Sequence, residues 1–149
     1  MADHGWIAAV AGDVYGDLGD YATIIRSWLD HPGVLTYVDE DVEPRGFTLL
    51  GFYEPSGTTP GAFVADLLAI AVAPGHQRQG IGTRLLEHAI QLAGVVGDSS
   101  GVAEIRLTVS ETNAVGQRFF TSFGFRVMDQ DHGRYDGGQR AIRMTRPVR

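Results

Sequence analysis

The spacing of apolar residues along the chain predicts three helices. Apolar residues recur at helical spacing within residues 19–33 and again from Ile81 to Ala93, and polar residues fill the opposite face of each segment. A shorter helix with an aromatic face is predicted over residues 112–125 and ends at Gly124. These three segments form the helical part of the predicted fold.

Shorter apolar or alternating runs predict the strands. They cover residues 6–12, 34–41, 46–54, 62–72 and 102–110, and residues 125–129 and 140–146 form a closing hairpin. Glycine, serine and proline predict a loop at residues 55–61 and a flexible connector at residues 94–101. Because helices and strands alternate, with antiparallel hairpins at both ends, we expect an α/β fold with a mixed sheet in a single domain spanning residues 1–149.

Composition narrows the class of protein. The 149 residues are 44% hydrophobic and 20% charged, which is typical of one folded globular domain. No apolar run reaches the roughly 20 residues of a membrane span, and the first residues lack the basic start of a signal peptide. We therefore expect a cytoplasmic protein with no membrane partner.

Several kinds of chemistry are excluded by composition. The chain contains no cysteine, which excludes disulfides, thiolate metal sites and an acyl-cysteine intermediate. The five histidines show no metal-ligand spacing, so no metal is predicted. The net charge is −6 and no basic stripe runs along the chain, so we expect no nucleic-acid partner.

The charge is unevenly distributed between the two halves of the chain. Residues 1–66 hold eleven acidic residues against two arginines, whereas residues 67–149 hold seven acidic residues against ten arginines. The charges could simply be scattered over a solvated surface. Alternatively, the second half holds an anionic ligand and the first half attracts a cationic one.

The stretch QRQGIG, residues 77–82, places Gly80 and Gly82 where the second helix must begin. Glycines in a first turn leave backbone N–H groups bare, and such a helix N-terminus binds anions. A Walker loop is excluded because it requires lysine, and the chain has none. A dinucleotide loop is disfavoured because Leu85 occupies the position of its third glycine. A Q/R-x-x-G-x-G/A loop that cradles a pyrophosphate fits, and glycines acting as plain turn formers are the alternative.

A second motif lies further along the chain. Asn113, Gly116, Phe120 and the pair Gly124-Phe125 match an N-x-x-A-x-x-x-Y-x-x-x-G-F pattern. Together with the strand and loop before it, this motif makes residues 62–146 resemble the GCN5-related N-acetyltransferase superfamily. The resemblance implies a single-domain α/β fold with a mostly antiparallel, twisted sheet flanked by helices. It also implies acetyl-CoA as co-substrate, in a cleft between the central strands.

The resemblance further implies which residues contact the cofactor. They are Ile70, Ala71, Val72, Gln77, Arg78, Gln79, Gly80, Ile81, Gly82, Thr83, Asn113 and Phe120. The strand residues contact the pantetheine arm and the thioester carbonyl, where a backbone N–H stabilises the developing oxyanion. The loop residues supply amides to the pyrophosphate, and Arg78 adds charge. Asn113 contacts the cofactor arm or, on residue type alone, caps a helix.

Two positions depart from the superfamily pattern, and one acid matches it. Phe120 stands where many members carry a tyrosine that protonates the departing thiolate, and Tyr135 is a candidate substitute. Thr108 stands where the bacterial ribosomal-protein alanine acetyltransferases, which this chain resembles, carry a glutamate. Asp66 matches the strand position of the base glutamate in histone acetyltransferases, so it is the candidate catalytic base, acting through water. An aspartate that faces solvent or bonds a loop is the alternative.

The resulting hypothesis is an N-acetyltransferase that passes the acetyl group from acetyl-CoA directly to a primary amine in a ternary complex. The acidic first half favours a cationic acceptor, either a small amine or a peptide N-terminus. The competing hypothesis is an acyl-CoA-binding sensor without turnover. Asp66 favours the enzyme, whereas Phe120 and Thr108 favour the sensor. Assembly into a homodimer is left open.

Overall fold

The computed structural model describes residues 4–54 and 63–148. In chain order its elements are α1 (His4–Tyr15), α2 (Tyr21–Leu29), β1 (Val34–Glu40), β2 (Pro44–Tyr53), β3 (Val64–Val72), α3 (Ile81–Ser100), β4 (Glu104–Ser110), α4 (Ala114–Ser122), β5 (Arg126–Asp129) and β6 (Ala141–Pro147). The loop predicted at residues 55–61 lies outside the described residues. No helix in the described ranges is long and apolar enough to cross a membrane.

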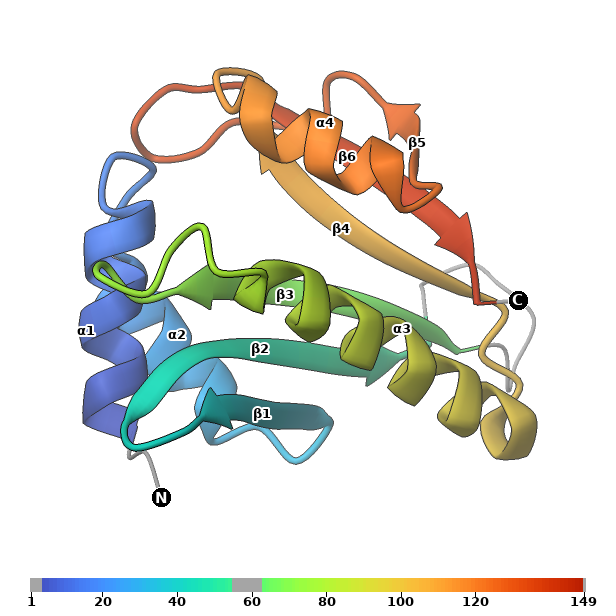
Figure 1. Ribbon diagram of the computed structural model, residues 1–149. Coiled ribbons are helices and arrows are strands. Elements are labelled where there is room, and N and C mark those ends of the chain that lie inside the picture. The colour runs from blue at the N-terminus through green and yellow to red at the C-terminus, as the bar shows by residue number, and fades with distance from the viewer. Residues whose placement is uncertain (1–3, 55–62, 149) are drawn as a thin grey trace.

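The strands form one mixed sheet in the order β1-β2-β3-β4-β6-β5. Neighbouring strands pair antiparallel except β3 and β4, which run parallel. This parallel contact is short, reaching only from Ala65 opposite Ile105 to Leu67 opposite Leu107. Beyond it the two strands diverge toward their carboxyl ends (Figure 1). The expected α/β fold with a mostly antiparallel sheet is confirmed.

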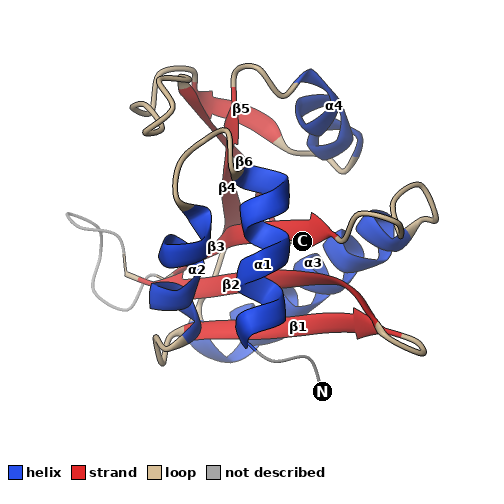
Figure 2. Ribbon diagram, turned by 90° about the vertical axis from the view of Figure 1, so that its left-hand side faces the viewer, coloured by secondary structure: helices blue, strands red, loops and turns tan. Residues whose placement is uncertain are grey.

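Helices cover both faces of the sheet. α1 and α2 lie on one face, where Ile7, Ile25 and Phe47 belong to one buried apolar cluster (Figure 2). α3 and α4 lie on the other face, where Leu86 and Phe120 belong to a second cluster. The central strands are therefore enclosed from both sides, which accounts for their nearly continuous apolar sequence.

Residues 6–12 form part of α1, so the strand predicted there is wrong. The buried residues Ile7, Ala8, Val10 and Ala11 follow the spacing of one helix face. The alanines in this run also favour a helix. A short apolar run of this kind does not distinguish a buried strand from a buried helix segment by periodicity alone.

The connector predicted at residues 94–101 is also wrong, because α3 continues to Ser100. Gly101 ends the helix in the left-handed region, with φ of 73°, and donates its N–H to the carbonyl of Gly97. A Cβ added to Gly97 would lie 2.5 Å from the carbonyl oxygen of Val102. Glycine at this position therefore lets the end of the helix pack against the chain that leads into β4.

The other predicted elements are confirmed with small shifts of their ends, including the antiparallel hairpin of β5 and β6. One detail of β3 could not be predicted. Leu49 of β2 pairs with Ala69 and Leu50 pairs with Leu67, so Leu68 has no partner and forms a β-bulge. Before the bulge Leu67 packs in the cluster beneath α3, and after it Ala69 packs in the cluster beneath α1.

Candidate active site

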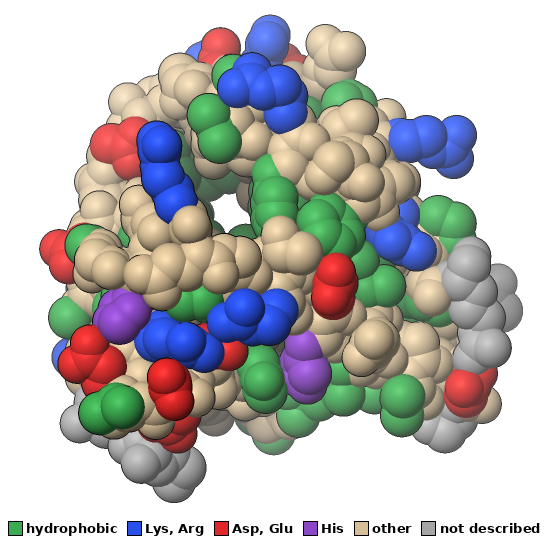
Figure 3. Space-filling model, in the orientation of Figure 1, with side chains coloured by type: hydrophobic (Ala, Val, Ile, Leu, Met, Phe, Trp, Pro, Cys, Tyr) green, Lys and Arg blue, Asp and Glu red, His purple; other side chains and the backbone are tan. Residues whose placement is uncertain are grey.

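The divergence of β3 and β4 opens a cavity of about 470 Å³. Its walls come from residues 67–72 of β3, residues 107–110 of β4, the end of α1, the start of α4 and Tyr135. The space-filling view shows an opening in the molecule between β3 and the β4–α4 side (Figure 3). Because side chains from both faces of the sheet line the cavity, two reactants could reach it from opposite sides.

The edge of β3 that faces the cavity carries backbone hydrogen-bonding groups. Ala73 donates its N–H to the carbonyl of Arg45 in the ladder with β2. In an antiparallel ladder the pairing alternates, so Ala69 and Ala71 also bond toward β2, whereas Ile70 and Val72 present their N–H and C=O groups to the cavity. The carbonyl of Val72 accepts a hydrogen bond from Nε2 of Gln77 at 3.2 Å.

The loop between β3 and α3 has the geometry of an anion cradle. Gly75 and Gly80 have φ values of 92° and 78°, and Arg78 is in the left-handed region with φ of 65°. Gly80 caps α3 without a side chain, and the first intrahelical bond runs from the N–H of Arg84 to the carbonyl of Gly80. The N–H groups of residues 81–83 therefore have no acceptor within the helix. A helix N-terminus of this kind favours a bound anion.

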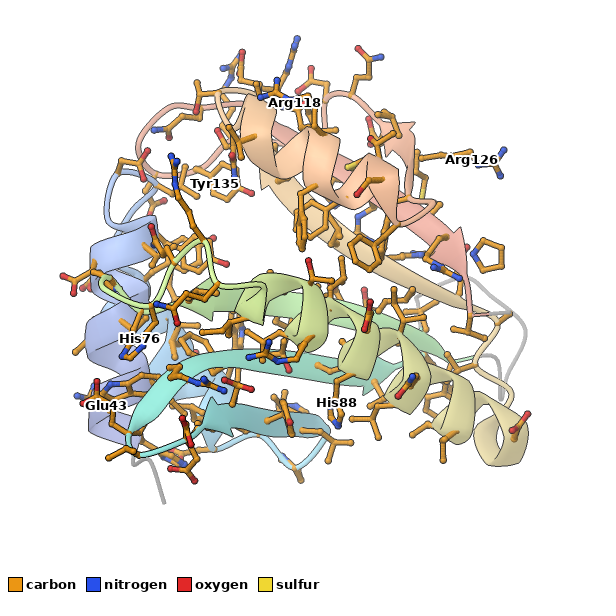
Figure 4. All side chains as sticks on the ribbon, in the orientation of Figure 1. Glu43, His76, His88, Arg118, Arg126 and Tyr135 are labelled. Carbon is orange, nitrogen blue, oxygen red and sulfur yellow. The ribbon has the colours of Figure 1, made fainter. Side chains whose placement is uncertain are left out.

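Ion pairs connect this loop to the β1–β2 hairpin. Within the hairpin, Nε of Arg45 donates to Asp39 at 2.8 Å, and Nη2 of Arg84, in the first turns of α3, lies 3.9 Å from the same carboxylate. The imidazole of His76 lies 2.8 Å from Glu43, and Figure 4 shows these two side chains side by side. The loop is thus anchored on the side away from the cavity.

The start of α4 forms the facing wall. Asn113 is the N-cap of α4, and its Oδ1 accepts a hydrogen bond from the N–H of Gly116 at 2.8 Å. Asn113 and Gly116 also line the cavity, so the capping role leaves the side chain at the site. Phe120 lines the cavity and packs against Phe119 and Phe125. It presents a ring without a hydroxyl.

Asp66 lies where β3 and β4 are still paired. It is opposite Arg106 in the sheet, and its side chain is 13% exposed. Its carboxylate accepts a hydrogen bond from the Tyr53 hydroxyl at 3.2 Å and lies 4.0 Å from Nη2 of Arg143. Burial raises the pKa of Asp66 above its ordinary value, and Arg143 and Tyr53 offset part of that rise. The cavity wall begins at the next residue, Leu67.

Three tyrosines gather at the end of the cavity near α1. Tyr15 and Tyr21 have ring centroids 5.1 Å apart, and Tyr135 comes from the chain between β5 and β6. The Tyr15 hydroxyl donates to the carbonyl of Ile70 at 2.5 Å and accepts from its N–H at 3.1 Å. Burial raises the pKa of Tyr15 to about 12 and also raises the pKa values of Tyr21 and Tyr135. All three remain neutral at physiological pH.

The segment that carries Tyr135 contacts the turn between α1 and α2. The N–H of Gly137 donates to the carbonyl of Leu18 at 3.0 Å, and Nε2 of Gln139 donates to the carbonyl of Asp17 at 2.9 Å. Asp17 and Leu18 both line the cavity. Two loops, far apart in the sequence, therefore close this end of the site.

The residues expected to bind the cofactor fall into two groups. Those that line the cavity are Ile70, Ala71, Val72, Gly82, Asn113 and Phe120. Those in the loop or first turn of α3, outside the cavity wall, are Gln77, Arg78, Gln79, Gly80, Ile81 and Thr83. Sequence reasoning missed Tyr15 and Tyr21, for which no local motif gave a signal. Within residues 4–54 and 63–148 no cluster of three His, Cys, Asp or Glu side chains could hold a metal ion.

Comparison with known proteins agrees with this geometry. The family profile described as "Acetyltransferase (GNAT) family" matches residues 5–125. The [ribosomal protein bS18]-alanine N-acetyltransferase of Escherichia coli K12 is 38% identical over 87 residues, a match that covers 56% of this chain and 56% of that relative. This match therefore spans little more than half the length of that relative.

Solved structures share the fold. The ribosomal-protein-S18-alanine N-acetyltransferase from Escherichia coli superposes with a TM-score of 0.64 and 26% identity, covering 85% of this chain and 76% of that one. NAA60 of Arabidopsis thaliana, in complex with acetyl-CoA, superposes with a TM-score of 0.76 over 98% of this chain and 93% of that one. At 11% identity the second likeness concerns the fold alone.

Proposed function

The chain belongs to the acetyltransferase (GNAT) family and is an acyltransferase that uses acetyl-CoA, and from that premise we propose that it transfers the acetyl group directly to a primary amine. The observation that carries the proposal is the cavity between β3 and β4, which is lined from both faces of the sheet. Acetyl-CoA would approach from the α3–α4 face and the amine from the face of α1 and α2. The two reactants would then meet in a ternary complex.

The cofactor residues expected from the sequence have a consistent placement in this proposal. The free N–H groups at the start of α3 would bind the pyrophosphate, and Val72 and Asn113 would flank the pantetheine arm. The NAA60 complex supports acetyl-CoA as the ligand of the fold. In this proposal the protein is a single catalytic domain that acts in the cytoplasm.

The reaction proceeds without a covalent enzyme intermediate in this proposal. The amine nitrogen attacks the thioester carbon, the C–S bond breaks, and coenzyme A leaves as a thiolate while the amine loses a proton. The chain has no cysteine that could carry the acetyl group between the two reactants. Asp66 would accept the amine proton through water, because it immediately precedes Leu67, where the cavity wall begins, and is not itself part of that wall.

The acceptor is a cationic amine, either small or the N-terminus of a peptide. Asp17 and three tyrosine rings line the acceptor side of the cavity, and such a surface attracts an ammonium group. The name of the Escherichia coli relative, which refers to alanine in ribosomal protein bS18, supports a peptide N-terminus. Thr108 stands where those enzymes carry glutamate, so we do not transfer their catalytic base to this chain.

A panel of amines tests the proposal. Small diamines, amino acid amides and short peptides with free N-termini are incubated with acetyl-CoA, and released coenzyme A is measured with a thiol reagent. The protein adds no background because it contains no cysteine. We expect release that requires both substrates, with intersecting initial-rate plots. Parallel plots together with an acetylated protein would contradict direct transfer.

A further inference from the structure

We propose that the hydroxyl of Tyr15 contacts the thioester carbonyl of acetyl-CoA and donates the hydrogen bond that stabilises the oxyanion. The inference rests on the proposed acetyl transfer and adds to it a catalytic side chain from α1. A backbone N–H of β3 was the donor expected from the sequence. In the structure a phenol stands between that N–H and the cavity.

The geometry of Ile70 carries the proposal. Ile70 lies two residues beyond the bulge at Leu68, on the part of β3 that β4 does not pair. Its N–H donates to the Tyr15 oxygen at 3.1 Å, and the same hydroxyl donates back to its carbonyl. Both backbone groups of Ile70 are therefore bound by one side chain, from 55 residues earlier in the chain.

The Tyr15 oxygen is held in place while its hydrogen can be redirected. The N–H of Ile70 uses one lone pair of the oxygen and fixes its position against the strand. The hydroxyl hydrogen can rotate from the carbonyl of Ile70 to an acceptor in the cavity, because a hydroxyl hydrogen turns to suit its partner. A thioester oxygen beside β3 is such an acceptor, and Tyr15 lines the cavity at this place.

The chemistry suits a hydrogen-bond donor that keeps its proton. The amine nitrogen forms a bond to the carbonyl carbon, and the π electrons of the carbonyl move to oxygen, where Tyr15 donates to the new anion. The electrons on oxygen then re-form the carbonyl, the C–S bond breaks, coenzyme A leaves as a thiolate, and the nitrogen loses its proton to the proposed base, Asp66, through water. Tyr15 is protonated throughout, since burial raises its pKa to about 12. The pKa of a thiol is about 8.5, so a thiolate can leave without a proton donor. This route therefore accommodates the absence of a hydroxyl on Phe120.

The neighbouring tyrosines provide the contrast. The ring of Tyr21 packs at a tilt against Tyr15, and both Tyr21 and Tyr135 line the same cavity. Among the described residues, Tyr15 alone joins its hydroxyl to the backbone of β3. Tyr37→Phe is the control for Tyr15→Phe, because Tyr37 of β1 stacks on His88 outside the cavity lining and the change also removes one tyrosine hydroxyl.

Steady-state kinetics test the role. For Tyr15→Phe we expect kcat to fall by about 10–100-fold, since loss of one oxyanion donor costs up to about 10³-fold and the freed N–H of Ile70 recovers part. The Kd for acetyl-CoA, measured by calorimetry, should change less than about twofold. Tyr37→Phe should retain the wild-type kcat. A Tyr15→Phe protein that binds acetyl-CoA more tightly and turns over at the wild-type rate would overturn the proposal, because the hydroxyl would then only obstruct β3.

The infrared frequency of the thioester carbonyl gives a second test. Infrared spectra of bound acetyl-CoA labelled with ¹³C at the carbonyl should show a lower stretching frequency in wild type than in Tyr15→Phe. Equal frequencies would overturn the contact. If the wild-type protein binds acetyl-CoA but transfers acetyl to no amine, the proposed function fails together with this role. A Tyr15→Phe variant with the wild-type kcat would reject the role of Tyr15 and leave the proposed acetyl transfer intact.

Discussion

Oδ1 of Asp39 lies 3.9 Å from Nη2 of Arg84, so an acid of β1 holds the first charged side chain of α3 close to the N-terminus of that helix. The guanidinium of Arg84 also lies 3.9 Å from the point where a Cβ on Gly80 would be. Arg84 is half exposed, at 51%. Its charge therefore lies beside the loop that would receive the phosphates of acetyl-CoA.

Removal of this charge should weaken cofactor binding without slowing the chemistry. For Arg84→Gln we expect the Kd for acetyl-CoA to rise about two- to fivefold, because a half-exposed charge contributes up to about 1 kcal/mol. The effect should shrink as salt is added. Arg126→Gln is the control, since Arg126 on β5 points away from the cavity in Figure 4. Equal Kd values for the two variants would show that the charge of Arg84 does not contribute to acetyl-CoA binding.

Gly82 offers a matched pair of substitutions at the start of α3. A Cβ here would lie 3.8 Å from Phe119 and from Val72, which is ordinary contact. Gly82→Ala should therefore keep most of the increase in Tm that acetyl-CoA produces. Gly82→Asp should abolish that increase, because a carboxylate would stand where the phosphates bind. A full thermal shift in Gly82→Asp would show that the phosphates lie elsewhere.

Asp66 should control the pH dependence of turnover if it is the base. Its raised pKa moves the acid limb of kcat above the ordinary aspartate range, and activity is lost as pH falls through that value. Asp66→Asn should lower kcat about 10²–10⁴-fold at neutral pH, with acetyl-CoA affinity almost unchanged. The deficit should shrink at high pH, where the amine is already deprotonated. An unchanged pH–rate profile in Asp66→Asn would assign the base elsewhere.

Two glycines of α3 should respond to alanine in opposite directions. A Cβ on Gly97 would lie 2.5 Å from the carbonyl oxygen of Val102, so Gly97→Ala should lower the free energy of unfolding by about 1–3 kcal/mol. A Cβ on Gly94 meets its nearest atom, the carbonyl oxygen of Val148, at 3.7 Å. Gly94→Ala should therefore raise the free energy of unfolding by up to about 1 kcal/mol, through helix propensity. Urea denaturation measures both, and equal effects would show that the helix ends before Gly97.

The strand–loop–helix around Gly80 could be predicted from the sequence because all its determinants are local. A continuous apolar run marks β3, and the glycines that follow mark the start of α3. The hairpin of β5 and β6 was predictable for the same reason. By contrast, an alanine-rich run left α1 indistinguishable from a short strand, and Gly97 was interpreted as a linker because its partner Val102 is in contact only after folding.

The acceptor side of the site depends on contacts between distant segments. Tyr15 meets Ile70 across 55 residues, and Gln139 meets Asp17 across 122. No spacing rule within a single chain connects such positions. The environment of Asp66 is of the same kind, since Tyr53 and Arg143 come from different strands of the sheet.

The extra residue Leu68 determines which face of the sheet the later residues of β3 occupy. Side chains alternate along a strand, so a regular strand would place Ala69 on the same face as Leu67. With Leu68 inserted, Ala69 and Ala71 lie beneath α1, and Ile70 meets Tyr15 at the open edge. Deletion of this one residue would remove the bulge and leave the later pairing intact, because Leu67 would still lie opposite Leu50 and Ala69 opposite Leu49. A gene for such a chain could therefore lose the codon of Leu68 without moving the amides of Ile70 and Val72, whereas loss of the codon of Ala69 or Ala71 would displace residues that are paired with β2.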